Sequence, residues 1–268
     1  MSKSVLYEQD DRIVKITLNR PDTRNALSGD IIEGLVEYIQ KADKDKNVGC
    51  VILTGAGKSF SSGGNLQEIK DMTTKDQMTQ AQLEDWYRFG IQKIPLTMNS
   101  IDVPVIAAVN GICCGGGLEW ALSADIILAA EHATFALPEI RSGTIADAAS
   151  IKLPKRIPYH IAMEMLLTGR WLNAEQAAQW GIINHIHKGE DLMGEARKMA
   201  ELLASGPPLV YAAIKEVVRE AEGMKFQDCL NKITKSQFET IDRLYHSEDQ
   251  LEGARAFAEK RDPVWKGR

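Results

Sequence analysis

The sequence predicts an α/β fold followed by a helical region. Short apolar runs that resemble buried strands alternate with helical patterns over the first two thirds of the chain, and the last third is helical in pattern. Glycine clusters follow two of the apolar runs, where the chain must turn sharply. No internal repeat or low-complexity linker interrupts this order.

Five apolar runs predict strands. They are rich in Val, Ile, Leu and Ala, and several are continuous apolar stretches, which is typical of strands buried on both faces. The first run, RIVKITL, ends at a turn that contains Pro21 and Asp22. The predicted strands are residues 12–18, 50–54, 104–109, 124–129 and 134–136.

The helices are predicted from amphipathic periodicity. Ser28 can cap a helix whose apolar side chains recur every three or four residues from Ile31 to Ala42. Residues 68–99 are polar with helical tendency, and they fit either a mobile flap or an ordered pair of helices. Further helices are predicted at 174–180, 191–204, 208–221, 225–245 and 250–260.

Composition limits the classes of function. The 268 residues carry a formal net charge of −5 with scattered basic residues, so the sequence has no nucleic-acid footprint. No run approaches the roughly 18 apolar residues of a membrane span. The polar start MSKSVLYEQDDR also lacks the apolar core of a signal peptide. We therefore expect a cytoplasmic protein that binds neither nucleic acid nor membrane.

Cysteine and histidine spacings predict no metal site. The four cysteines form no Cys-x-x-Cys pair, and the five histidines form no His-Glu-x-x-His motif. His185 and His187 would share one side of a strand, but a surface pair is favoured because no third ligand is evident. Reduced thiols are the expectation.

The segment TGAGKSFSSGG, residues 54–64, at first suggests a nucleotide-binding loop. Gly57, Lys58 and Ser59 match the end of a Walker A motif, and the segment follows a predicted strand. The full motif needs a glycine five residues before Gly57, where the chain has Ile52 in the middle of that strand. The glycines therefore serve another purpose.

Two segments share one design, in which a buried strand leads into glycines and then a helix. They are residues 61–66 and 115–119. Glycine lets backbone amides approach a ligand closely, and a helix start favours negative charge. Two such amides directed at one oxygen would form an oxyanion hole. The alternative, that the glycines only mark tight turns, stays open from the residues alone.

Two glutamates accompany these segments. Glu119 lies in the first turn of the apolar helix LEWAL, and Glu139 follows a proline at a strand end. If the apolar flanks bury both, their raised pKa values would suit proton transfer, and two close carboxylates would titrate apart into an acid and a base. Equally, both could face solvent, with Glu119 complementing the helix dipole.

These motifs resemble the crotonase, or enoyl-CoA hydratase/isomerase, superfamily over almost the whole chain. The Gly-Gly-Gly-x-Glu motif and the later Pro-Glu pair are specific when combined with their flanks. The matching segments are LNRPDTRNAL (18–27), VILTGAGKSFSSGGNL (51–66), PVIAAVNGICCGGGLEWALSADI (104–126), TFALPEIRSG (134–143), LLTGRWLNAEQAAQWGIIN (166–184) and EGARAFAEKRDPVWKG (252–267).

The resemblance implies a fold, an assembly and a ligand. Residues 1–200 would form a spiral of ββα units, and residues 201–268 a helical region that builds a homotrimer or a dimer of trimers. The substrate would be an acyl-CoA thioester. Its coenzyme A is part of the substrate, so no separate cofactor is expected.

The resemblance also implies a mechanism. Backbone N–H groups of Gly64 and Gly116 would hold the thioester oxygen as it becomes enolate-like. Glu119 and Glu139 match the two catalytic glutamates of hydratases, which hold one water between them. Glu119 would activate that water toward Cβ, and Glu139 would handle the Cα proton. An enoyl-CoA isomerase and a non-catalytic acyl-CoA-binding or assembly protein remain alternatives.

Eight residues match positions that contact coenzyme A in the family. Arg24 and Lys260 suit anionic phosphates, and the tail residues could reach a neighbouring subunit's ligand. Ordinary solvated side chains are the alternative. The residues are Arg24, Ala26, Ser62, Asn65, Leu66, Gln67, Phe257 and Lys260.

Three features depart from the family pattern. Asn65 replaces the usual acidic residue after the glycines, and residues 146–150 (ADAAS) lack the usual glycines. Trp120 is bulkier than the usual leucine. These departures affect the expected specificity for the acyl group more than the expected class of reaction.

The tail is most similar to the carnitinyl-CoA dehydratase branch of the family. A trimethylammonium acyl group would favour an aromatic or acidic wall. Trp86, Tyr87, Trp120 or Asp147 could supply one, although ordinary core and surface positions are the favoured interpretation for all four.

Overall fold

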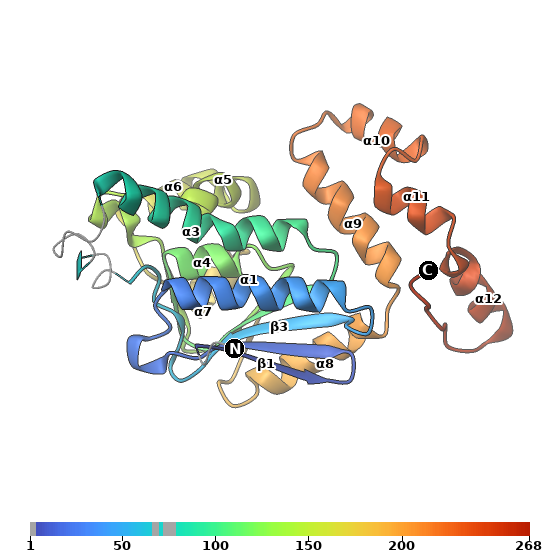
Figure 1. The fold of residues 1–268 in the computed structure, drawn as a ribbon, viewed down its shortest axis with the longest axis horizontal. Helices are drawn as coiled ribbons and strands as arrows, with labels where there is room; N and C mark the ends of the chain where they lie inside the picture. The colour runs from blue at the N-terminus through green and yellow to red at the C-terminus, as the bar shows by residue number, and fades with distance from the viewer. Residues whose placement is uncertain (1–3, 66–69, 72–78) are drawn as a thin grey trace.

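A six-stranded sheet forms the centre of the structure (Figure 1). The structure is a computed structural model that describes residues 4–65, 70–71 and 79–268, without the side chains of residues 80 and 83–88. Its order is β1-β2-β3-β5-β7-β10, with only the β1–β2 pair antiparallel. A smaller sheet has the order β4-β6-β8-β9. The strands are β1 (Val5–Asp10), β2 (Ile13–Leu18), β3 (Cys50–Gly55), β4 (Ser59–Ser61), β5 (Val105–Val109), β6 (Ile112–Cys114), β7 (Ile126–Ala130), β8 (Thr134–Ala136), β9 (Leu172–Asn173) and β10 (His185–His187).

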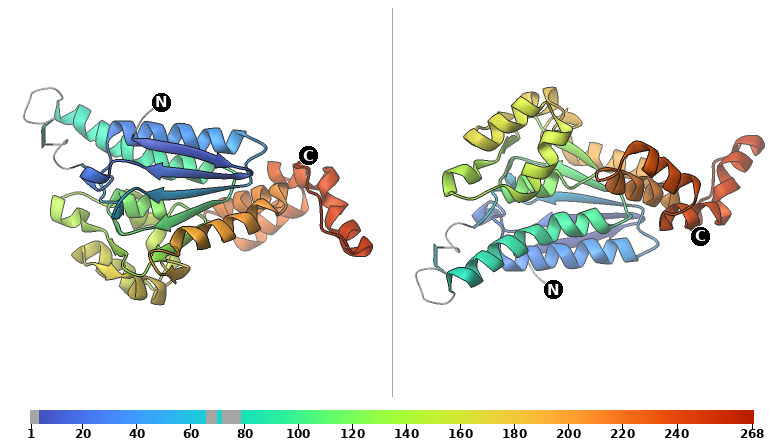
Figure 2. Two further views of the ribbon diagram at one scale, coloured as in Figure 1. Left: turned by 90° about the horizontal axis from the view of Figure 1, so that it is seen from below. Right: turned by 90° about the horizontal axis from the view of Figure 1, so that it is seen from above.

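Helices cover both faces of the large sheet (Figure 2). Helices α1 and α3 pack on one face and α8 on the other. The α-helices are α1 (Gly29–Lys44), α3 (Gln80–Ser100), α4 (Gly116–Ala121), α5 (Asp147–Arg156), α6 (Tyr159–Thr168), α7 (Ala174–Gln179), α8 (Leu192–Ala204), α9 (Pro208–Ala221), α10 (Phe226–Thr234), α11 (Glu239–Tyr245) and α12 (Glu252–Glu259). Short 3₁₀ helices are η1 (Pro21–Thr23), η2 (Pro138–Ser142) and η3 (Glu248–Leu251).

The chain repeats one unit: a strand of the large sheet, a strand of the small sheet, then a helix. The unit occurs as β3-β4-α3, β5-β6-α4 and β7-β8-α5. It confirms the predicted α/β spiral of ββα units. Because β4, β6 and β8 are parallel neighbours, their carboxyl ends meet at one edge of the small sheet.

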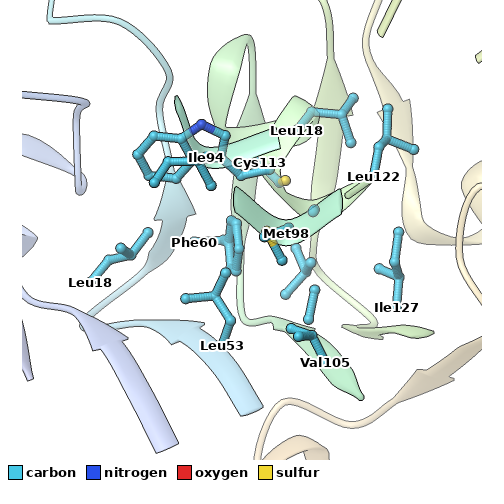
Figure 3. Packing of buried hydrophobic residues seen from close by; sticks show 14 of the residues in the cluster. Leu18, Leu53, Phe60, Ile94, Met98, Val105, Cys113, Leu118, Leu122 and Ile127 are labelled. Atoms are coloured by element: carbon cyan, nitrogen blue, oxygen red, sulfur yellow. The ribbon is translucent and has the colours of Figure 1, made fainter. Parts of the chain in front are cut away.

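The main core lies between the two sheets and the helices α1, α3 and α4 (Figure 3). Phe60 of β4, Leu118 of α4 and Ile94 of α3 are fully buried there. Trp120 is 0% exposed and belongs to the same core. The structure therefore confirms a core position for this tryptophan, which does not form part of an acyl wall.

The structure corrects several predicted elements. The helix expected at 225–245 is two helices, α10 and α11, since the chain between them adopts a left-handed conformation at Ser236 (φ 50°). Strands β1, β4, β6, β9 and β10 were not predicted, because most are very short and β1 has a largely polar sequence. The described part of the 68–99 segment includes one long helix, α3.

Helices α9 to α12 extend from one side of the sheet layers (Figure 1). They carry exposed apolar side chains, namely Ile214, Val218, Phe226, Tyr245 and Phe257.

Candidate active site

The two glycine segments and Glu139 all follow strands that end at one edge of the small sheet. Gly63 and Gly64 follow β4, Gly115 and Gly116 follow β6, and Glu139 follows β8. The parallel register of these strands explains how residues about 80 positions apart reach one site.

The glycine segments touch each other. A Cβ atom added to Gly63 would lie 2.8 Å from the carbonyl oxygen of Cys114 and 3.3 Å from Cα of Gly115. Both Gly63 and Gly115 have positive φ, at 80° and 57°, which side chains rarely permit. The Sγ of Cys114 also donates to the carbonyl of Ser62 at 3.1 Å. Glycine at these positions is thus required for close approach as well as for turning.

Leu27 links the two predicted amide donors. Its backbone N–H donates to the carbonyl of Gly63 at 2.9 Å, and the residue pairs with Gly64 in a parallel bridge. Its Cδ1 lies 2.6 Å from the position that a Cβ of Gly116 would occupy. Gly116 is the first residue of α4, so its N–H has no carbonyl partner within the helix. This arrangement fits an oxyanion hole between Gly64 and Gly116.

The first segment differs from the predicted design. Gly64 lies beside Leu27 in the isolated bridge, and the residues directly after Asn65 lie outside the described part of the chain. A helix start is therefore shown for Gly116 and not for Gly64. Ile52 lies within β3 and Ser59 within β4, which agrees with the rejection of a nucleotide-binding loop.

Glu119 is a buried carboxylate, 3% exposed. Its Oε1 accepts a hydrogen bond from the N–H of Ala149 in α5 at 3.0 Å. Its Oε2 lies 3.9 Å from the position of a Gly116 Cβ. One oxygen of Glu119 is therefore fixed by α5, and the other faces the glycine segment.

Glu139 also lies against this glycine segment. Its Oε1 would be only 2.9 Å from a Cβ on Gly115, so the missing side chain makes room for the carboxylate. Its Oε2 is buried and has no hydrogen-bond partner among the described residues. Both glutamates thus direct an oxygen toward the loop that carries Gly115 and Gly116.

The environment raises the pKa of both acids. Burial, opposed by the Ala149 hydrogen bond and reinforced by the charges of Glu139 and Asp147, raises the pKa of Glu119 to about 7. Burial also raises the pKa of Glu139, with the charge of Asp147 adding to the effect. The pair can therefore retain a proton near neutral pH, as acid–base work requires.

Residues 146–150, which depart from the family pattern, still contribute to the site. Helix α5 begins at Asp147 although residues 146–150 contain no glycine, and the N–H of Ala149 reaches Glu119. Asp147 is half-buried, and its Oδ2 accepts a hydrogen bond from Nε2 of Gln92 at 2.7 Å.

The predicted coenzyme A residues fall into two groups. Ser62 belongs to the first glycine segment, and its N–H donates to the Arg24 carbonyl at 3.0 Å. Ala26 precedes Leu27, whose N–H donates to the carbonyl of Gly63. Asn65 follows Gly64, whereas Leu66 and Gln67 lie outside the described residues.

The tail residues do not reach the site within one chain. Helix α12, which carries Phe257 and precedes Lys260, lies at the opposite end of the molecule from η1 (Figure 1). Phe257 is 88% exposed.

Leu27, Ile91, Gln92 and Ala149 are site residues that the sequence did not single out. Leu27 and Ile91 pack over Gly116, while Gln92 and Ala149 bind the acids. Of the residues considered for an acyl wall, Asp147 is half-buried and acts by its charge on both glutamates, whereas Trp120 lies in the core. The side chains of Trp86 and Tyr87 lie outside the description.

The described residues form neither a metal-ion cluster nor a membrane-spanning helix. No group of three or more His, Cys, Asp or Glu side chains within them is arranged to hold a metal ion. None of the helices built from these residues is long and apolar enough to cross a membrane.

The ββα spiral brings two acids to one glycine loop, an arrangement that fits acid–base chemistry. The family model described as "Enoyl-CoA hydratase/isomerase" matches residues 8–268. The chain belongs to the enoyl-CoA hydratase/isomerase family. This result confirms the resemblance and the enzyme class that the sequence predicted.

Relatives extend the similarity over the whole chain. Carnitinyl-CoA dehydratase of Escherichia coli strain K12 is 39% identical over 270 residues, which cover all of both chains. Among solved structures, enoyl-CoA hydratase from Bacillus anthracis is 32% identical with a TM-score of 0.87, covering 99% of this chain and all of that one. Enoyl-CoA hydratase from Mycobacterium tuberculosis H37Rv is 35% identical with a TM-score of 0.84, covering 99% of each chain.

Proposed function

We propose that this enzyme catalyses the reversible hydration of a 2-enoyl-CoA thioester to a 3-hydroxyacyl-CoA. The observation that carries the proposal is the pair of glutamates, the buried Glu119 and the half-buried Glu139, each with an oxygen beside the Gly115–Gly116 loop. Two acids beside one loop can hold a single water across the double bond. An isomerase needs one acid to move a proton between carbons, so the second glutamate favours hydration.

The amides of Gly64 and Gly116 act first in this mechanism. They donate to the thioester oxygen as charge develops on it, which makes Cβ electrophilic and Cα able to accept a proton. The water oxygen then bonds to Cβ, one water proton passes to a carboxylate, and a proton from the acid pair is delivered to Cα. Atoms balance, because one molecule of water is added and the pair regains its proton.

The glutamates act as a pair that shares one proton. The family resemblance assigns water activation to Glu119 and the Cα proton to Glu139. The strong burial of Glu119 instead favours the proton on Glu119 in the free enzyme. Since both bind the same water and interact, the singly protonated pair is the functional unit.

We also propose that the acyl group is cationic, as in a carnitinyl thioester. Asp147 adds a negative charge beside the two glutamates, and several relatives are carnitinyl-CoA dehydratases. The comparison of crotonobetainyl-CoA with crotonyl-CoA tests this: a kcat/KM at least tenfold higher for the cationic substrate supports it, and equal values oppose it.

The helical region 201–268 is proposed to assemble a trimer or a dimer of trimers, with Phe257 and Lys260 near a neighbouring subunit's ligand. Its exposed apolar side chains fit an interface. Light scattering after size-exclusion chromatography would measure the assembly; a monomer at micromolar concentration opposes it.

The four buried free cysteines fit a reducing compartment such as the cytoplasm.

The absorbance of the conjugated enoyl thioester tests the reaction. With crotonyl-CoA or crotonobetainyl-CoA, wild type should remove this absorbance, and Glu119→Gln and Glu139→Gln should each slow the loss by about 10²–10⁴-fold. Glu131→Gln, at an exposed glutamate outside the site, should match wild type. No loss with either substrate, while acyl-CoA still binds, would favour the isomerase or non-catalytic alternatives.

A further inference from the structure

Asp147 places a third carboxylate beside the glutamate pair. It is the first residue of α5 and is half-buried. Its Oδ2 accepts a hydrogen bond from Nε2 of Gln92 on α3 at 2.7 Å. Hydrogen bonds to an ionised acceptor are stronger than neutral ones, so this contact ties α3 to the start of α5.

The start of α5 is also where Glu119 is held. Ala149, two residues after Asp147 and in the same helical turn, donates its N–H to Oε1 of Glu119 at 3.0 Å. The N-cap residue Ala146 has no capping side chain. The Glu119 carboxylate therefore satisfies an amide that the first turn of a helix would otherwise leave unpaired.

Helix α3 touches the other half of the site through the neighbouring residue. Cγ2 of Ile91 lies 3.4 Å from the position of a Cβ on Gly116. Ile91 and Gln92 thus bring one helix against both the oxyanion amide and Asp147. A shift of α5 would move the Ala149 N–H that holds the Glu119 carboxylate.

We propose that Asp147, held by Gln92, is a positioning residue for the hydration reaction: it fixes the first turn of α5 and acts by its charge on both glutamates. The inference deepens the proposed function and rests on it. Gln92 acts through Asp147 and not by contact with the reacting atoms.

The charge acts in a defined direction. Asp147 contributes to the raised pKa of Glu119 and to that of Glu139. Among the described residues, the other charged groups that act on Glu119 are Glu139, which raises its pKa, and Lys152, whose own pKa is affected by Glu119. Removing the charge of Asp147 should therefore lower the proton affinity of the pair.

An acid in the first turn of a helix commonly serves only the helix dipole. Glu175 provides the matched control, since it is an exposed acid in the first turn of α7. If Asp147 served only the dipole, Asp147→Asn and Glu175→Gln would have the same small effect on stability and none on the pH profile.

The pH profile of kcat/KM tests the charge. Asp147→Asn can still accept the hydrogen bond from Gln92, but it carries no charge. The alkaline limb, on which the pair loses its last proton, should move to lower pH by roughly half a unit or more. Glu175→Gln should leave the limb in place. An unmoved limb in Asp147→Asn overturns the charge role.

A double-mutant cycle tests the hydrogen bond. Gln92→Met removes the donor and should lower kcat at least fivefold. In the Asp147→Ala background the same change should alter kcat less than twofold, because its partner is gone. Equal fold-losses in both backgrounds would mean that Gln92 acts independently, and the positioning role would be wrong.

A readout without catalysis separates this inference from the proposed function. Urea unfolding measures the free energy of unfolding as a function of pH. In wild type this free energy falls over the pH range in which Glu119 ionises, and in Asp147→Asn that range should move to lower pH. If wild type hydrates no substrate but this range moves, the proposed function fails and the action of Asp147 on Glu119 stands. If hydration is normal and neither the range nor the limb moves, the inference alone fails.

Discussion

Glu119→Gln should make the protein more stable at alkaline pH. The carboxylate is 3% exposed, and burial raises its pKa from 4.5 to about 7. A raised pKa in the folded state means that the ionised form is disfavoured by folding. The protonated form contributes its stability fully below pH 4.5, and the contribution is lost as pH rises through 7. The shift corresponds to about 3 kcal/mol at high pH.

The Glu119→Gln substitution removes this dependence of stability on pH. Its Oε1 can still accept from Ala149, but it cannot ionise. The free energy of unfolding of Glu119→Gln minus that of wild type should grow by roughly 2–3 kcal/mol between pH 5 and pH 8. Urea unfolding at four pH values and fixed protein concentration would measure it. Glu131→Gln should show no such growth. A pH-independent difference for Glu119→Gln would refute the buried, protonated carboxylate.

Further predictions concern the glycine segments. Gly115→Ala places a Cβ 2.9 Å from Oε1 of Glu139, so hydration should fall at least about 100-fold. Gly143→Ala is its control, with a similar positive φ and no atom within 4 Å of the new Cβ: it should lose about 1–2 kcal/mol of stability by urea unfolding and keep its activity. Equal activities would contradict the close packing of Glu139. Asn25→Ala should cost about 2–4 kcal/mol, because the buried amide donates to the carbonyls of Ala56 and Ser59; a urea midpoint close to wild type would show that these bonds do not hold the segment.

The sequence predicted the elements whose periodicity is strong. Helix α9 was expected at its observed bounds, and the buried strands β3, β5 and β7 lie where continuous apolar runs occur. Strands β4 and β6 escaped prediction because each has only three residues and lies beside glycines. These two strands bring the glycine segments together, so their juxtaposition followed from the family resemblance and not from propensity.

The residues of the candidate site also divide into those with a local sequence signal and those without one. Glu119, Glu139 and the glycines stand out in the sequence because an acid in an apolar flank and a glycine run are local signals. The contact of Gln92 with Asp147 joins residues 55 positions apart on two helices. No local pattern indicates such a contact, since it depends on how α3 packs against α5. Trp120 illustrates the converse: a conspicuous aromatic residue beside Glu119 lies wholly in the core.

The most direct test of the central claim is the transfer of solvent oxygen to the product. Wild type incubated with a 2-enoyl-CoA in ¹⁸O-labelled water should yield 3-hydroxyacyl-CoA with one ¹⁸O at Cβ, detected by mass spectrometry. Glu119→Gln and Glu139→Gln should form this product at least about 100-fold more slowly. A product with a shifted double bond and no ¹⁸O would contradict the account, because it would show that the two glutamates move protons without activating water.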